Sequence, residues 1–189
     1  MYLFDKKTAL LILDVQKGFD DPYWGERCNP EAEMNISRLL AAWRERSMPV
    51  IYSQHLSKQP DSPINENNKH NTEFKDTLKP AQGETVFTKQ VNSAFIGTEL
   101  EVYLRRNDIM KVVITGLSTQ HCVSTTTRMS GNLGFSTYLV SDATAAFGTR
   151  DHEGTYYPPE VIQKVELAQL HKEFGVIAAT EEILHSLEV

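Results

Sequence analysis

The sequence predicts a three-layer α/β/α protein of Rossmann-like class, with a mostly parallel six-stranded sheet and helices on both faces. Short apolar runs alternate along the chain with segments of helical spacing, which is typical of parallel sheets. Residues that start or stop helices stand at the ends of several of these segments. At 189 residues and 40% hydrophobic content, the chain is expected to form one domain over residues 1–189.

Six runs are expected to be strands. The run at 8–14, TALLILD, is almost continuously apolar, as in a central parallel strand that is buried on both faces. It ends in a carboxylate, which must be paired or functional because burying an unpaired charge is costly. The remaining five predicted strands are 50–53, 84–88, 112–115, 136–140 and 176–178.

Five segments are expected to be helical. Asn29 is a plausible N-cap for the first, and Pro159 and Gly175 stand at the start and just past the end of the fourth. The predicted helices cover 30–46, a segment from the capping box at 98–101, 122 to about 131–134, 159–174 and 181–187. The polar segment 57–80 has weak periodicity, so it is expected to be a functional loop or to be disordered.

Three reactive side chains fall at or just after the carboxyl ends of different predicted strands: Asp14, Lys89 and Cys122. Ligands of open parallel sheets bind at that edge. Cys122 also stands at a predicted helix N-terminus, where the helix dipole is expected to lower the pKa of its thiol. Asp14 would accept the thiol proton, and Lys89 would hold the carboxylate and stabilise the thiolate.

Each of these residues also has a structural interpretation. Cys122 could be a small buried hydrophobe, Asp14 could cap a turn, and Lys89 could be a solvated surface charge. The placement of all three at one edge of the sheet favours a catalytic site.

Composition and charge argue against several classes of partner. A formal net charge of −6 and a pI near 5.5 argue against nucleic acid and anionic membranes. The longest apolar run near the start, 9–13, is too short to span a bilayer. Two cysteines do not make a disulfide framework, so a cytoplasmic location with reduced thiols is expected.

Several short motifs resemble one known superfamily. They are Leu13-Asp14-Val15-Gln16 with Phe19, Lys89 with Ser93-Ala94-Phe95, Gly97-Thr98 with Leu100, Gly116–Val123 with Thr126 and Arg128, and Asp142-Ala143 with Phe147. Over nearly the whole chain the sequence resembles the isochorismatase-like cysteine hydrolases, which include nicotinamidases, N-carbamoylsarcosine amidase and isochorismatase.

The resemblance implies a mechanism. Asp14, Lys89 and Cys122 match the catalytic triad of the superfamily. Its oxyanion hole would use the backbone N–H groups of Ser118 and Cys122, beside a non-proline cis peptide at Leu117–Ser118. Cys122 would attack the carbonyl of a small amide or carbamoyl compound to form a thioester, and Asp14 would act first as acid and then as base. Relatives are commonly oligomeric, and the 57–80 loop together with Trp24 suggests a homo-oligomer.

The sequence departs from the superfamily at its metal site. Nicotinamidases hold a metal with an Asp-x-His pair after the second strand, where this chain has His55-Leu56-Ser57. No HExxH or other metal-ligand spacing is present, so neither a metal nor another cofactor is expected. The presence of Cys122 places the chain on the amide-hydrolase side, because isochorismatase itself lacks the cysteine.

Candidate substrate-binding residues lie near these motifs. His55 could bind substrate at the mouth of the site or be a structural histidine, and the aromatic residues could equally belong to the core. The full candidate set is Gln16, Phe19, Trp24, His55, Phe95 and Phe147. Two further functions stay open: an ester or other acyl hydrolase using the same triad, and a catalytically silent binding or regulatory module that kept the fold.

Overall fold

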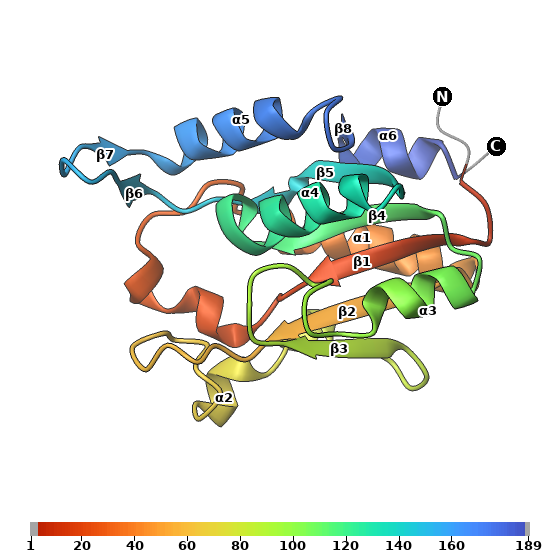
Figure 1. Ribbon diagram of the computed structural model, residues 1–189, viewed down its shortest axis with the longest axis horizontal. Helices are drawn as coiled ribbons and strands as arrows, with labels where there is room; N and C mark the ends of the chain where they lie inside the picture. Colours follow the sequence, from red (N-terminus) through yellow and green to blue (C-terminus); the bar gives the residue numbers. More distant parts are fainter. Residues whose placement is uncertain (1–3, 188–189) are drawn as a thin grey trace.

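A single parallel sheet forms the centre of the computed structural model, which describes residues 4–187 (Figure 1). Its six strands run in the order β3-β2-β1-β4-β5-β8, and each neighbouring pair is parallel. They are β1 (Thr8–Leu13), β2 (Val50–His55), β3 (Thr85–Lys89), β4 (Lys111–Leu117), β5 (Ser136–Ala145) and β8 (Val176–Ala178). The predicted α/β/α class and the six-stranded sheet are therefore confirmed.

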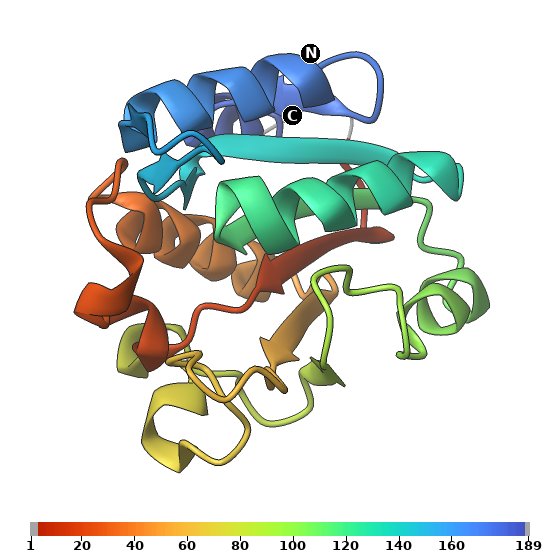
Figure 2. The same ribbon diagram turned by 60° about the vertical axis from the view of Figure 1, so that its left-hand side comes forward.

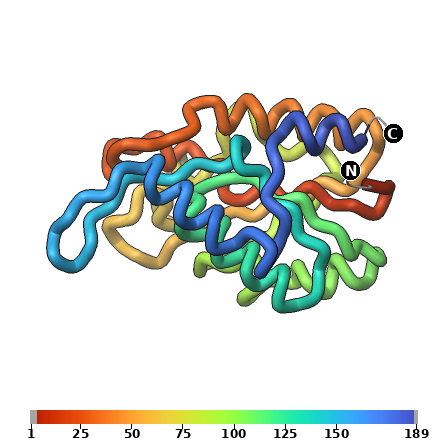
Figure 3. Tube along the Cα trace, turned by 90° about the horizontal axis from the view of Figure 1, so that it is seen from above, coloured from red at the N-terminus to blue at the C-terminus, as the bar shows by residue number. Residues whose placement is uncertain are grey.

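Helices cover both faces of the sheet. On one face lie α1 (Ala32–Glu45) and α6 (Thr180–His185), and on the other lie α3 (Leu100–Arg106), α4 (Ser124–Asn132) and α5 (Pro159–Leu170) (Figure 3). Successive side chains of a strand point to opposite faces. Leu10 and Ile12 of β1 therefore enter the core beneath α1, while Ala9 and Leu11 enter the core beneath α3 and α4. Burial on both faces explains why the first run is almost entirely apolar.

Some segments differ from the sequence-based predictions. The fourth predicted helix ends at Leu170 rather than 174, because His171 is extended and Lys172 has a φ of 69°. A small hairpin, β6 (Thr149–Arg150) and β7 (Tyr156–Tyr157), has no counterpart among the predicted strands and projects from the body (Figures 1 and 3). Two-residue strands bury too little apolar surface to leave a recognisable pattern.

The polar segment 57–80 is ordered and carries the short helix α2 (Lys69–Thr72). It lies beyond the carboxyl ends of β1 and β2, close to the two 3₁₀ turns at Lys17–Asp20 and Pro22–Trp24 (Figure 2). The segments that surround the carboxyl edge of the sheet are therefore loops with little regular structure, as is usual for a binding site.

Among the described residues, no helix is long and apolar enough to cross a membrane.

Gly116 allows β4 to approach β1 near this edge. Its φ is +121°, a conformation that only glycine adopts readily. A Cβ at this position would lie 2.1 Å from the carbonyl oxygen of Leu13. Because the clash is with the backbone of the neighbouring strand, no side-chain movement can relieve it. Gly116 thus sets the spacing between the strand that precedes Asp14 and the strand that leads to Cys122.

We expect Gly116→Ala to reduce the free energy of unfolding by about 3 kcal/mol, because it combines overpacking with an unfavourable φ. Gly134→Ala is the matched control: its φ is +84°, but its Cβ would meet nothing within 4 Å. The control should cost only about 1 kcal/mol, which is the conformational term alone. Urea denaturation of both variants measures the difference, and equal losses would show that the contact with Leu13 is unimportant.

Candidate active site

A pocket of about 610 Å³ opens at the carboxyl edge of the sheet. One wall is aromatic and is formed by Phe19, Tyr23 and Trp24 from the 3₁₀ turns. The other walls are mainly polar. They come from the end of β2 and the loop after it, from the segment after β3, from the turn after β4 and from the start of α4. Their residues are His55, Ser57, Lys58, Gln59, Ser62, Ile64, Gln90, Val91, Asn92, Ser93, Ile96, Ser118, His121, Cys122 and Thr125. Its size suits a small-molecule ligand.

A buried ion pair lies beneath the pocket. The Nζ atom of Lys89 is 2.7 Å from Oδ2 of Asp14, and both side chains are fully buried. The Ser53 hydroxyl donates a 2.6 Å hydrogen bond to Oδ1 of Asp14, and Lys89 donates a 3.1 Å hydrogen bond to the carbonyl of Val91. Lys89 stands at the end of β3 and reaches across β2, so the pair joins two strands that are not neighbours.

The pair keeps its charges despite its burial. Burial alone would lower the pKa of Lys89, but the attraction of the Asp14 carboxylate outweighs that effect and raises it. Lys89 is therefore an ammonium group at neutral pH. Removing one partner of such a pair would leave an uncompensated charge in the interior, which is strongly unfavourable.

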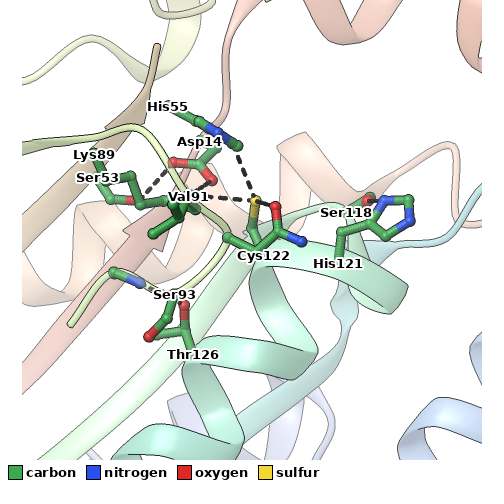
Figure 4. A network of polar contacts seen from close by, with 12 residues as sticks. Asp14, Ser53, His55, Lys89, Val91, Ser93, Ser118, His121, Cys122 and Thr126 are labelled. Atoms are coloured by element: carbon green, nitrogen blue, oxygen red, sulfur yellow. Dashed lines mark hydrogen bonds and ion pairs between the residues drawn. The ribbon is translucent and has the colours of Figure 1, made fainter. Parts of the chain in front are cut away.

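The thiol of Cys122 meets this pair from the pocket side (Figure 4). Its Sγ atom lies 3.2 Å from Nζ of Lys89 and 3.4 Å from Nδ1 of His55. Cys122 belongs to a π-helical turn, Thr119–Val123, that leads directly into α4. The sequence-based placement of Cys122 at a helix start thus agrees with the structure, although the first turn is wider than an α-helix.

The predicted lowering of the Cys122 pKa is wrong for the resting protein. Burial raises the pKa of the thiol, and the negative charge of Asp14 raises it further, whereas the attraction of Lys89 only partly opposes them. Only 3% of Cys122 is exposed, a degree of burial that sequence position cannot reveal. Cys122 is therefore a thiol at rest, and it needs a proton acceptor in order to react.

His55 is buried beside the thiol. Its backbone N–H donates to the side-chain oxygen of Gln16, and its carbonyl accepts from the same amide. Burial and the nearby charge of Lys89 lower the pKa of the imidazole, with Asp14 acting in the opposite direction. The ring is accordingly neutral at neutral pH, and one of its nitrogens is an acceptor.

The turn before Cys122 borders the pocket through Ser118 and His121. The Leu117–Ser118 peptide bond is cis, and Ser118 directly precedes the π-helical turn. His121 lies on the Ser118 side of Cys122, with its Nδ1 atom 3.2 Å from the Ser118 hydroxyl (Figure 4). Partial desolvation lowers the pKa of the His121 imidazole, and the charge of Glu166 opposes this effect.

The structure places half of the predicted substrate-binding residues at the pocket: Phe19, Trp24 and His55. Phe147 stacks on Phe19 at 6.2 Å between ring centroids and supports the aromatic wall from behind. Gln16 and Phe95 have structural contacts instead. The amide of Gln16 is used by the backbone of β2, and the Phe95 ring stacks on Phe135 at 5.9 Å in the core beneath α3.

Sequence reasoning missed several residues in or beneath the pocket. Ser53 contacts Asp14, and its one signal was a hydroxyl within the apolar run of β2. Asn92, whose Oδ1 atom lies 3.9 Å from the thiol, and Gln59 belong to loops without a periodic pattern. Their approach to the pocket is decided by the path of the loops, which no local pattern predicts.

One group of side chains has the composition of a metal site. Asp14, His55 and Cys122 offer ligand atoms that all lie within 4.8 Å of one another. The metal pair that the resemblance associates with nicotinamidases is not formed here, because His55 and Ser57 occupy its positions. The positive charge beside Asp14 is the ammonium group of Lys89.

The sheet, together with the thiol at its carboxyl edge, places the protein among α/β enzymes whose pocket is built by loops after the strands. Residues 8–157 match the model of the isochorismatase domain, so the chain belongs to the isochorismatase family and is a hydrolase of that family. It is 55% identical over 181 residues to the isochorismatase family protein YrdC of Bacillus subtilis (strain 168), covering 96% of each chain.

Two further comparisons concern structure and activity. A crystal structure of a hydrolase of the isochorismatase family from Chromobacterium violaceum superimposes with a TM-score of 0.94 at 39% identity, covering 99% of this chain and 97% of that one. The ureidoacrylate amidohydrolase RutB of Klebsiella pneumoniae is 26% identical over 182 residues, which cover 96% of this chain and 68% of RutB.

Replacing Asp14 by Asn should make the thiol more reactive toward iodoacetamide at neutral pH. The charge that raises the Cys122 pKa is removed, while Lys89, which lowers it, remains. Each unit by which the pKa falls gives about ten times more thiolate. In a Cys28→Ala background, which leaves one thiol, we expect labelling to be about tenfold faster than with Asp14 present. A pH–rate profile measures both pKa values, and an unchanged or higher pKa in the Asn variant would contradict this account.

Proposed function

We propose that this protein hydrolyses a C–N bond of a small amide or carbamoyl compound through a thioester on Cys122, without a metal. The observation that carries the proposal is the contact of one thiol with a buried carboxylate–ammonium pair on the floor of a pocket. Asp14 can accept a proton there, Lys89 can hold two negative groups, and Cys122 is the nucleophile that faces the substrate.

In the first half of the reaction, Sγ of Cys122 attacks the substrate carbonyl carbon, and the thiol proton moves to the Asp14 carboxylate. Lys89 stabilises the negative charge at sulfur as the S–H bond breaks. The carbonyl oxygen becomes an oxyanion and accepts hydrogen bonds from the N–H groups of Ser118 and Cys122. The C–N bond then breaks, and Asp14 gives its proton to the departing nitrogen, so the amine or ammonia leaves neutral.

In the second half, water attacks the thioester carbonyl and passes a proton to Asp14. The tetrahedral intermediate collapses by breaking the C–S bond. The proton held by Asp14 returns to the sulfur, which restores the Cys122 thiol and releases the carboxylic or carbamic acid. Asp14 thus acts as base and acid in each half, and Lys89 keeps it ionised between the two.

Two supports come from outside the triad. RutB is named as an amidohydrolase, and it is similar to this chain over nearly the whole of the described fold. The pocket is lined by the aromatic side chains of Phe19, Tyr23 and Trp24 and by uncharged polar groups such as Gln59, Gln90 and Asn92. A small planar amide could contact the aromatic side chains and form hydrogen bonds with the polar groups of the same pocket.

The test is a screen of small amides, carbamoyl compounds and esters, with the wild type beside Cys122→Ala. Ammonia release that depends on Cys122 would support the amide reaction. Turnover of esters alone would favour the ester-hydrolase alternative. Absence of any Cys122-dependent turnover across the screen would favour a binding or regulatory module.

With a substrate in hand, Asp14→Asn should lower turnover by about 10²–10⁴-fold, the usual contribution of a general base. Lys89→Ala should also be severe, because it leaves Asp14 buried without its counter-charge. Cys122→Ser should be nearly as inactive as Cys122→Ala, since a hydroxyl has a much higher pKa than a thiol. Steady-state kinetics with circular dichroism as the folding control measures these effects. Near-normal turnover of the Asn variant would move the role of base to His55.

Prolonged treatment with a chelator should leave turnover intact, because Lys89 provides the positive charge at the site and no step uses a metal. Atomic absorption before and after treatment, in parallel with activity, measures this. Loss of a stoichiometric metal together with activity, and recovery of both on adding that metal back, would contradict the proposed mechanism.

A further inference from the structure

We propose that Cys122, His55 and Asp14 form a site for Zn²⁺ and similar thiophilic divalent ions, and that occupation of this site blocks the nucleophile reversibly. These ions would act as inhibitors and not as cofactors. The inference rests on the geometry of three buried side chains and does not depend on which bond the enzyme cleaves.

The distance between the ligand atoms of Cys122 and His55 fits a tetrahedral zinc ion. Zinc lies about 2.3 Å from a thiolate sulfur and about 2.05 Å from an imidazole nitrogen. At a tetrahedral angle these bond lengths place the two ligand atoms about 3.5 Å apart. The Sγ atom of Cys122 and the Nδ1 atom of His55 are 3.4 Å apart in the structure. The ion can therefore bind both atoms without rearrangement of either side chain.

His55 is held in the orientation that a metal ligand requires. Gln16 fixes its backbone from both sides, and the imidazole ring has a hydrogen bond with the backbone of Gln90. A metal-bound histidine commonly donates its other ring N–H to such a partner, which leaves the facing nitrogen with a lone pair for the ion. Here the facing nitrogen is Nδ1, and its neighbour is the thiol of Cys122.

Asp14 supplies the third ligand. Its Oδ2 atom is buried and lies 2.7 Å from the ammonium group of Lys89, a contact that engages one of the two lone pairs of the oxygen. One lone pair of that oxygen is thus available, and the carboxylate lies within 4.8 Å of both other ligand atoms. Water from the pocket would complete the four-coordinate geometry that zinc prefers.

The site is reached from the pocket, and its ligand types decide which ions it binds. Cys122 and His55 face the pocket, whereas Lys89 is fully buried behind them, so an ion can enter without passing the ammonium group. Thiolate and imidazole ligands favour Zn²⁺ and Cd²⁺ over Mg²⁺ and Ca²⁺, which prefer oxygen ligands. On binding, the S–H bond of Cys122 breaks, a sulfur–metal bond forms, and the proton leaves to solvent. The lone pair that would attack a carbonyl is then engaged.

The experiment measures binding and thiol blocking without any substrate. Zn²⁺ is titrated into Cys28→Ala protein against a chromophoric zinc indicator, and the rate of iodoacetamide labelling of Cys122 is followed in parallel. We expect one Zn²⁺ per chain, loss of labelling as the ion binds, full recovery with EDTA and no effect of Mg²⁺. With Cd²⁺, the ultraviolet charge-transfer band of a cadmium thiolate should appear in the unaltered protein.

Variants of the two histidines at the pocket distinguish Zn²⁺ binding at this site from non-specific Zn²⁺ binding elsewhere on the protein. His55→Gln removes one ligand and should weaken Zn²⁺ binding by about 100-fold, in the range seen when metal sites lose a supporting group. His121→Gln is the matched control, because its ring contacts Ser118 and not the thiol, and it should bind as the wild type does. Circular dichroism checks the folding of both variants.

Unchanged affinity in His55→Gln, or Zn²⁺ binding that leaves Cys122 open to labelling, would overturn the proposal. Absence of the cadmium–thiolate band in the unaltered protein would overturn it even if the His55 variant failed to fold. Because none of these readouts involves turnover, failure of the proposed amide hydrolysis would leave the result of this test intact.

Discussion

The buried pair of Asp14 and Lys89 is the interaction on which the rest of the site depends. An ammonium group and a carboxylate with no exposure to solvent are stable only together, because each compensates the charge of the other. The pair also has a structural consequence, since Lys89 extends from β3 across β2 to a residue that follows β1. The charges therefore fix three strand ends relative to one another at the edge where the pocket opens.

The same pair controls the state of the thiol. Asp14 opposes ionisation of Cys122, and Lys89 favours it, so the two partners act in opposite directions on one sulfur atom. With burial added, the balance at rest lies on the side of the neutral thiol. A neutral thiol reacts slowly with electrophiles, and in the proposed reaction Asp14 makes it a nucleophile by taking its proton. This explains how a reactive cysteine can be kept in a pocket that is open to small molecules.

His55 is a neutral partner of the thiol, beside the two charged ones. Its position beside Cys122 follows from β2, which extends two residues further than the sequence predicts, and from the Gln16 amide that joins the ends of β1 and β2. A neutral imidazole at 3.4 Å from a sulfur atom is both an acceptor for the thiol proton and a ligand for a thiophilic ion. The proposed reaction and the proposed zinc site therefore share this side chain.

The sequence by itself determined the sheet, its parallel direction and the candidate residues at its carboxyl edge. Alternating apolar runs and helical segments specify layers, and polar residues directly after the strands mark the edge where a site forms. Asp14, Lys89 and Cys122 were all identifiable because each stands at the end of a regular element, where position along the chain fixes position in space.

The tertiary structure decided what these residues do to one another. Ser53 contacts Asp14 and His55 contacts the Cys122 thiol, and the residues in each pair are 39 or more positions apart in the sequence. The energies of these contacts depend on the exclusion of water around the buried Cys122. The local position of Cys122 predicts a lowered pKa for its thiol, but burial and the charge of Asp14 raise that pKa instead. Desolvation and charge depend on the whole surrounding volume, which no local sequence pattern specifies.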